Sequence, residues 1–526
     1  MENQNNDTVG MRLLEKGKRG IWRTVFSRGG MFTILLLIQL AVLISIFGFF
    51  SDFTAHYYIA TIVLYGGTMM YLINSRINPT AKITWLVLIM LVPVFGVGML
   101  IYTKADVGHR AVKARVEQLI AETDGLLCQN PAVADDLKKQ SPETAALSNY
   151  INRAGCFPVY EDTYIKYFPQ GEDKFDQLLI ELEKAEHFIF LEYFIIDEGI
   201  MWGRVLDILA RKASEGVDVR LMYDGTCEFT TLPHNYPKRL KALGINCKMF
   251  SPVTPFISTH YNYRDHRKIV VIDGHTAFTG GINLADEYIN EYERFGHWKD
   301  TAIMLKGEAV KSFTLMFLQL WNVDEKEPEF RKFLEYPAEN IRPARGFVIP
   351  YGDCPLDDEK VGEMVYIDIL NRAQNYVHIM SPYLILDGET ETALKFAAER
   401  GVDVSLILPG IPDKKTAFAL AKTHYASLIE AGVKIYEYTP GFVHAKVFVA
   451  DDIKAVVGTI NLDYRSLYHH FECAAYMYGT DCIPDIESDF QNTLKKCTQI
   501  TKNSIKNEKP GIKIAGKLLK VVAPLM

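Results

Sequence analysis

The sequence lacks several features that mark common functional classes. Its eight cysteines lie far apart without a C-x2-C pair, so we interpret them as scattered reduced thiols, not as a zinc or dithiol redox site. It contains neither a P-loop nor a G-x-G-x-x-G segment after a strand, which argues against a nucleotide cofactor. The net charge is −7. A chain of this charge has no overall attraction for nucleic acid, so we expect no nucleic-acid partner.

Long hydrophobic runs are present near the N-terminus, at Met31–Phe50, Tyr57–Ile73 and Ile83–Tyr102. A helix of 20 residues is about 30 Å long, which matches the hydrocarbon core of a bilayer. We therefore expect two or three membrane spans within residues 31–103, after a basic cytoplasmic segment at residues 1–30. Pro93 lies inside the third run and would allow it to break or re-enter. Basic residues flank the runs on both sides, so the side of the membrane that carries the rest of the chain stays open.

The C-terminal segment, residues 501–526, alternates lysines with aliphatic residues. This pattern favours a basic amphipathic helix that lies on anionic lipid, with a disordered tail as the alternative. The chain is thus expected to be embedded in a membrane at one end and held against it at the other.

Between these ends, short β-rich runs alternate with helical stretches, and the pattern occurs twice. The segment 188–195 matches 376–384, and 216–221 matches 401–406 almost letter for letter. Such alternation predicts an α/β fold in which helices flank a mixed sheet. We expect a linker at residues 104–139, a first domain at 140–345 and a second domain at 346–500.

Each half carries one copy of the pattern H-x-K-x4-D-x6-G-(S/T)-x-N. The first copy consists of His266, Lys268, Asp273, Gly280 and Asn283, and the second of His444, Lys446, Asp451, Gly458 and Asn461. A single histidine near a lysine is usually a surface or packing residue. Two copies in the same register predict a catalytic site that both halves share.

The residue types suit displacement at a phosphodiester. One histidine can attack phosphorus while the other donates a proton to the departing alcohol. The two lysines can neutralise the phosphate, and the two asparagines can donate hydrogen bonds to it. The duplicated aspartates have two open interpretations, catalytic support or the closing of a strand. The predicted site requires no metal, because lysine and asparagine already supply positive charge and donors.

A catalytic histidine also needs an acceptor that orients its other ring nitrogen. Glu472 is the candidate in the second half, and Asp300 is the weaker candidate in the first.

At these motifs the chain resembles the phospholipase D superfamily. It departs from the pattern at Gly281, where serine or threonine is usual, whereas the second copy keeps Thr459. The departure removes one hydroxyl donor, so we expect the phosphate contacts to differ between the halves.

The chain also resembles the bacterial cardiolipin synthases of this superfamily. The resemblance includes Asn78-Pro79 and Pro93 in the membrane part, the segment 262–268, and the segment 458–466. It implies a multi-pass protein of the bacterial cell membrane that needs no cofactor. In the implied reaction, phosphatidyl passes from one phosphatidylglycerol to another through a phosphohistidine, and glycerol is released.

By the same analogy His266 is the nucleophile and His444 the general acid, although the reverse assignment is physically equivalent. The alternatives are a hydrolase that uses water and a transferase that uses another alcohol. Oligomeric state and acyl-chain preference are not indicated by the sequence.

Overall fold

The computed structural model describes residues 54–75, 77–105, 110–251, 263–336, 344–357 and 359–525, together with four isolated positions before them. The chain divides into two compact units. The larger unit extends from Lys113 to Gly516 and holds both motif copies, and the smaller unit holds the helices nearest the N-terminus and the last residues of the chain.

The smaller unit contains the helices α3 (Thr54–Asn74), α4 (Pro79–Leu91) and α5 (Pro93–Ala105) and the short η6 (Ala523–Leu525). Its core consists of Leu72, Trp85, Ile89, Val97 and Leu100. A Cβ atom on Gly96 would lie 2.8 Å from Cα of Ile89, so glycine at this position allows α5 to pack closely on α4.

The predicted membrane runs correspond only partly to these helices. Met31–Phe50 and the basic N-terminal segment lie outside the described residues, apart from four positions. The second run, Tyr57–Ile73, lies in α3. The third run is divided at Val92, because the residue before a proline is disfavoured in a helix. Among the helices that the structure describes, none combines the length and the apolar character needed to cross a membrane.

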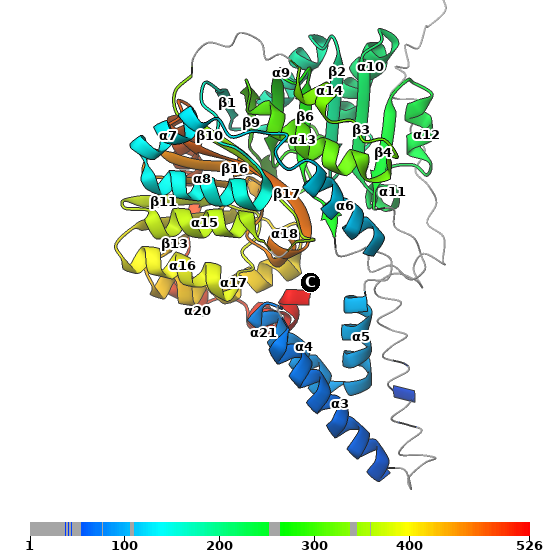
Figure 1. Cartoon of the computed structure of the whole chain (residues 1–526). Helices are drawn as coiled ribbons and strands as arrows, with labels where there is room; N and C mark the ends of the chain where they lie inside the picture. The colour runs from blue at the N-terminus through cyan, green and yellow to red at the C-terminus, as the bar shows by residue number, and fades with distance from the viewer. Residues whose placement is uncertain are drawn as a thin grey trace, which may run out of the picture. The chain divides into compact units, whose positions relative to one another are not determined.

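The larger unit contains two mixed sheets of the same topology, as predicted from the repeat (Figure 1). The first has the order β1-β9-β7-β6-β2-β3-β4, and the second has the order β10-β17-β16-β15-β11-β12-β13-β18. In each sheet the three consecutive strands β2-β3-β4 or β11-β12-β13 pair in parallel, and the motif strand pairs antiparallel with its neighbours. The mixed α/β class is therefore confirmed.

The strands of the first sheet are β1 (Tyr164–Phe168), β2 (Phe188–Tyr193), β3 (Asp218–Asp224), β4 (Asn246–Phe250), β6 (Lys268–Ile272), β7 (Thr276–Gly280) and β9 (Ala302–Lys306). Those of the second are β10 (Phe347–Asp353), β11 (Tyr376–Met380), β12 (Asp403–Pro409), β13 (Lys434–Tyr438), β15 (Val447–Ala450), β16 (Lys454–Gly458), β17 (His470–Tyr478) and β18 (Cys497–Gln499).

The larger helices are α6 (Arg110–Glu122), α7 (Pro131–Gln140), α8 (Pro142–Gly155), α9 (Gly171–Glu183), α10 (Ile200–Ser214), α13 (Val310–Trp321), α15 (Val361–Arg372), α16 (Gly388–Glu399), α17 (Lys415–Glu430), α19 (Ile483–Leu494) and α21 (Pro510–Val522). Short helical turns are α11 (Cys227–Thr230), α12 (Tyr236–Lys241), η4 (Asp286–Ile289), η5 (Asn322–Asp324), α14 (Arg331–Leu334), α18 (Tyr464–Tyr468) and α20 (Lys502–Lys506).

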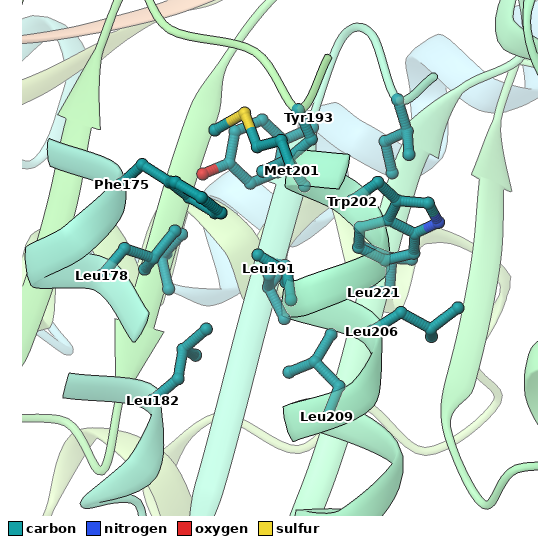
Figure 2. Close-up of a cluster of buried hydrophobic side chains, with 14 of the residues drawn as sticks. Phe175, Leu178, Leu182, Leu191, Tyr193, Met201, Trp202, Leu206, Leu209 and Leu221 are labelled. Atoms are coloured by element: carbon teal, nitrogen blue, oxygen red, sulfur yellow. The ribbon is translucent and has the colours of Figure 1, made fainter. Parts of the chain in front are cut away.

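Apolar side chains from helices and strands form the core of each half. In the first half, Phe175 and Leu178 of α9 and Trp202 and Leu206 of α10 pack over Leu191 of β2 (Figure 2). All five are at most 3% exposed. Burial of this kind contributes about 1.5–3 kcal/mol for each large side chain, so the core holds the sheet and its strand ends in fixed positions.

Short strands connect the two halves. β5 (Arg264–Asp265) pairs in parallel with β17, and β14 (Gly441–Val443) pairs in parallel with β8 (His297–Lys299). In addition, α8 packs against β10 and α15 of the second half, although it lies at the start of the predicted first domain. The two halves consequently form one compact unit.

Candidate active site

The strand pairs between the halves position both motif histidines. His266 directly follows β5, and its N–H donates to the carbonyl of Phe471 at 3.0 Å. His444 follows β14, and its N–H donates to the carbonyl of Lys299 at 2.7 Å. The next residues along those partner segments are Glu472 and Asp300. Backbone pairing therefore places a carboxylate from the opposite half beside each histidine.

The side chains complete these two pairs. Nδ1 of His266 lies 2.9 Å and 3.0 Å from the two carboxylate oxygens of Glu472, and Nδ1 of His444 lies 2.7 Å from Oδ2 of Asp300. A carboxylate at Nδ1 leaves Nε2 of each ring available to react. The alignment of the halves suggested one carboxylate for each half, whereas the structure pairs them across the halves.

The two motif lysines lie beside the histidines. Nζ of Lys268 donates to the carbonyl of His266 at 2.6 Å, and Nζ of Lys446 donates to the carbonyl of His444 and lies 2.9 Å from its Nδ1. Burial lowers the pKa of Lys268 to about 8 and that of Lys446 to about 7. Burial thus disfavours the charged form of both lysines, and an anion bound next to them would favour it.

The histidines share one electrostatic environment. Burial lowers the pKa of His266 well below its usual value, and Lys268, Lys446 and His444 act in the same direction. Burial and Lys446 lower the pKa of His444 to about 4, against the opposing effect of Asp300. Burial alone would raise the pKa of Asp300, but His444 and Lys446 keep it below the usual value. The two imidazoles are therefore neutral and buried beside two lysines, and this arrangement suits a bound anion.

The sequence suggested Thr459 as a hydroxyl donor to phosphate, and the structure shows its hydroxyl paired with a carboxylate. Its hydroxyl donates to Oε2 of Glu472, so it holds the carboxylate that orients His266. The glycine at position 281 is explained by steric exclusion, because a Cβ atom there would lie 2.0 Å from Oδ1 of Asp300. The first half therefore has glycine because Asp300 occupies the space of a side chain.

The sequence left two roles open for Asp273 and Asp451, catalytic support or the closing of a strand. The contacts in the structure correspond to the second role. The Asp273 carboxylate accepts from the backbone N–H groups of residues 186, 187 and 188, at 2.7–2.8 Å. Asp451 does the same with residues 374, 375 and 376, at 2.8–3.0 Å. Each aspartate closes the start of a central strand. Five residues of extended chain place Asp273 about 16 Å beyond Lys268, too far to assist the histidine.

The two asparagines are not equivalent in the structure. The amide of Asn283 donates to the hydroxyl of Tyr288 at 2.7 Å, and its oxygen accepts from the N–H of Ile195 at 3.0 Å. Oδ1 of Asn461 is buried without a partner among the described residues. Only Asn461 has a side-chain oxygen free for a ligand.

One group of side chains near the site has the composition of a metal site. Ligand atoms of His266, His470 and Glu472 lie within 4.8 Å of one another. Lys268 and Lys446 surround the same histidine and would repel a dication, and Glu472 already accepts from His266. The electrostatics therefore suit a phosphate anion better than a metal ion.

Several residues at the site were given no specific role from the sequence, which left His470 as structural or substrate-lining. His470 lies with its ring centroid 5.2 Å from that of His266, and Phe194 lies 4.8 Å from it. Tyr288 lies 5.4 Å from His444. A sequence signal existed only for His470, which stands two residues before Glu472 on β17 and thus shares its face.

Comparisons with known proteins agree with this geometry. A family model described as "Cardiolipin synthase, PLD-like domain" matches residues 178–321 and 366–494. A cardiolipin synthase of Alkalihalophilus pseudofirmus is 33% identical over 468 residues, which cover 88% of this chain and 92% of that protein. An uncharacterized protein of Streptococcus mutans is 58% identical over 460 residues, 88% of this chain and 100% of that protein.

Among solved structures, the phosphatidylserine synthase of Haemophilus influenzae superimposes with a TM-score of 0.55 at 15% identity, over 73% of this chain and 98% of that one. This likeness concerns the fold. Together with the duplicated motifs, the comparisons place the chain in the phospholipase D superfamily. Within it, the chain belongs to the cardiolipin synthase family and is an enzyme of the phosphatidyltransferase class.

Proposed function

We propose that this protein makes cardiolipin from two molecules of phosphatidylglycerol. The observation that carries the proposal is the crossed pair of histidine–carboxylate contacts, with a lysine beside each histidine. This arrangement offers one imidazole for attack, one for proton transfer and two ammonium groups for the phosphate.

In the first step, Nε2 of His266 attacks phosphorus of the donor lipid. The phosphorus–oxygen bond to the glycerol headgroup breaks, and His444 gives its proton to the departing oxygen. Burial keeps His444 neutral in the empty site, and the negative charge of a bound phosphodiester raises its pKa toward the protonated form. Glu472 stabilises the positive charge that His266 acquires.

In the second step, the terminal hydroxyl of another phosphatidylglycerol attacks the phosphohistidine. His444 takes the hydroxyl proton, and the phosphorus–nitrogen bond to His266 breaks. One primary-alcohol diester replaces another, so the exchange needs no activated nucleotide. Asn283 is held by Tyr288 and supports the fold of the site, while Asn461 faces the substrate.

The test supplies purified full-length protein with phosphatidylglycerol in micelles, with chelator present and nucleotide absent. Equal amounts of free glycerol and a four-chain lipid are expected. His266→Ala and His444→Ala should each abolish turnover, and His275→Ala in the turn between β6 and β7 serves as the control. Phosphatidic acid as the sole lipid product, or an obligatory cytidine-activated lipid, would exclude the proposed reaction.

We also propose that the enzyme works at the cell membrane, where its substrate resides. Helix α21 supports this proposal, because Ile514, Leu518 and Val521 are 61%, 68% and 44% exposed and stand at helical spacing. The helix contains lysines and no acidic residue. An exposed apolar face beside lysines suits the surface of an anionic bilayer.

Vesicle flotation tests the role of α21. Leu518→Ser should weaken binding to vesicles that contain phosphatidylglycerol, whereas Ile180→Ser, at another exposed site on α9, should not. Unchanged flotation of the Leu518 variant would exclude α21 as a binding element.

A further inference from the structure

Three residues of the second half carry unpaired polar atoms. Oδ1 of Asn461, Oγ of Ser466 and both ring nitrogens of His470 are buried without a hydrogen-bond partner among the described residues. The three residues are 4%, 1% and 6% exposed. A buried polar group without a partner destabilises the fold, so several of them indicate a partner that the folded chain does not supply.

In the first half of the chain, the equivalent polar groups are hydrogen-bonded. Tyr288 and Ser466 each stand five residues after the motif asparagine. The Tyr288 hydroxyl accepts from the amide of Asn283 at 2.7 Å. The oxygen of Asn283 accepts from the N–H of Ile195 at 3.0 Å. In the second half, Oγ of Ser466 and Oδ1 of Asn461 are both unpaired. The motif asparagine and the residue five positions after it are thus paired in the first half, whereas their counterparts in the second half have free polar atoms.

His470 lies next to the reacting histidine, and Ser466 occupies the sequence position that matches Tyr288, which lies beside the other motif histidine, His444. The ring of His470 is 5.2 Å from that of His266, centroid to centroid, and inclined by 35°. Its Nδ1 lies 3.6 Å from Oε1 of Glu472, which is longer than a hydrogen bond. A ligand that reaches His470 is therefore close enough to take part in a reaction at His266.

The chemistry of the cluster indicates a neutral ligand. Burial lowers the pKa of His470 to about 3, and the adjacent His266 acts in the same direction. The neutral ring has one donor and one acceptor, the amide oxygen of Asn461 accepts, and the hydroxyl of Ser466 does both. The unpaired atoms offer few donors to an anion. An ammonium ion would be repelled by Arg465, which acts on His470, and by Lys268, which acts on His266, whereas vicinal hydroxyl groups can pair with every unpaired atom.

We propose that Asn461, Ser466 and His470 form a polyol subsite that binds the glycerol headgroup of phosphatidylglycerol. This inference rests on the proposed function. In the first step glycerol leaves the phosphorus. In the second step a hydroxyl of another glycerol headgroup attacks the same phosphorus. One subsite can therefore serve both steps, and it must release glycerol before the acceptor enters.

The subsite makes the enzyme prefer a glycerol headgroup over water and over simple alcohols. A site that is built to pair hydroxyl groups discriminates against ligands that lack them, because its own polar groups then stay unpaired. The residues named here position the acceptor, while His266 and His444 carry out the chemistry.

The experiment compares wild type with His470→Phe and Ser466→Ala in vesicles of phosphatidylglycerol, with ethanol as a competing acceptor. We expect the ratio of cardiolipin to phosphatidylethanol to fall about tenfold in each variant, as the loss of one or two hydrogen bonds implies. Inhibition by added glycerol should weaken by a similar factor. His275→Phe is the matched control. If His470→Phe does not fold, Ser466→Ala still tests the subsite.

An unchanged product ratio and unchanged glycerol inhibition in both variants would overturn the subsite and leave the proposed function intact. An equal loss of cardiolipin and phosphatidylethanol would also overturn it, because the residues would then act on the chemical steps or the fold. A wild type that forms neither product would instead refute the proposed function.

Discussion

The carboxylate of Glu472 lies 2.9 Å from Nδ1 of His266, although 206 residues separate the two along the chain. Asp300 and His444 form the reciprocal contact at 2.7 Å. Each half therefore supplies the reacting imidazole of one pair and the orienting carboxylate of the other. Neither half contains both the histidine and the carboxylate of a pair. Activity therefore depends on both halves being folded together.

Glu472→Gln should lower kcat about 10- to 100-fold, because an amide stabilises the charged imidazole less well. Asp300→Asn should have an effect of the same order. The measurement is steady-state cardiolipin formation by purified variants of verified fold.

The chain offers a matched control for this change. Glu487 lies 2.9 Å and 3.0 Å from Nδ1 of His378, in the same kind of contact outside the site. Glu487→Gln should leave kcat near the wild-type value. A wild-type rate in Glu472→Gln would show that His266 does not need this carboxylate.

Gly281→Ser would restore the residue that is usual in the motif, yet it should inactivate the enzyme. The new Cβ would lie 2.0 Å from the Asp300 carboxylate and displace it from His444. Gly203→Ala on α10 is the control, since no atom lies within 4 Å of its added Cβ. Full activity of the serine variant would mean that Asp300 can move without cost.

Asp273→Ala should destabilise the protein and spare the chemistry. Three backbone N–H groups lose their acceptor, which lowers the free energy of unfolding by about 2–4 kcal/mol. Denaturant titration measures this loss, and Asp135→Ala on the exposed face of α7 should show none. If kcat of the folded variant falls along with its stability, the aspartate has a catalytic role as well.

The pH dependence follows from the pKa values of the lysines and His444. Lys446 and Lys268 have pKa values lowered to about 7 and about 8, and His444 to about 4, mainly by burial. All three act in the protonated form, which is present below these values and lost above them. We expect kcat/KM to fall as pH rises above about 4, more steeply above about pH 7 and again above about pH 8.

An arginine variant tests the origin of this fall. Lys446→Arg keeps its charge at high pH, so the decrease near pH 7 should become shallower even if the maximal rate is lower. An identical profile in wild type and variant would assign the fall to another group.

The sequence by itself determined the repeat, the mixed α/β class and the two motif copies, because all of these depend on local period and spacing. It also identified Glu472 and Asp300 as carboxylates near the histidines. It did not predict that they pair across the halves, because that pairing follows from the parallel strands β5–β17 and β8–β14, which join segments far apart in the chain.

Only the tertiary structure decided between the two roles of the motif aspartates. The pattern places Asp273 five residues after Lys268 but does not say where its carboxylate points; the fold directs it to three backbone N–H groups. Tertiary packing also explains why glycine occupies position 281, and it leaves the ring nitrogens of His470 without a hydrogen-bond partner. Burial and contacts between distant segments produce these features, and the order of residues alone does not specify them.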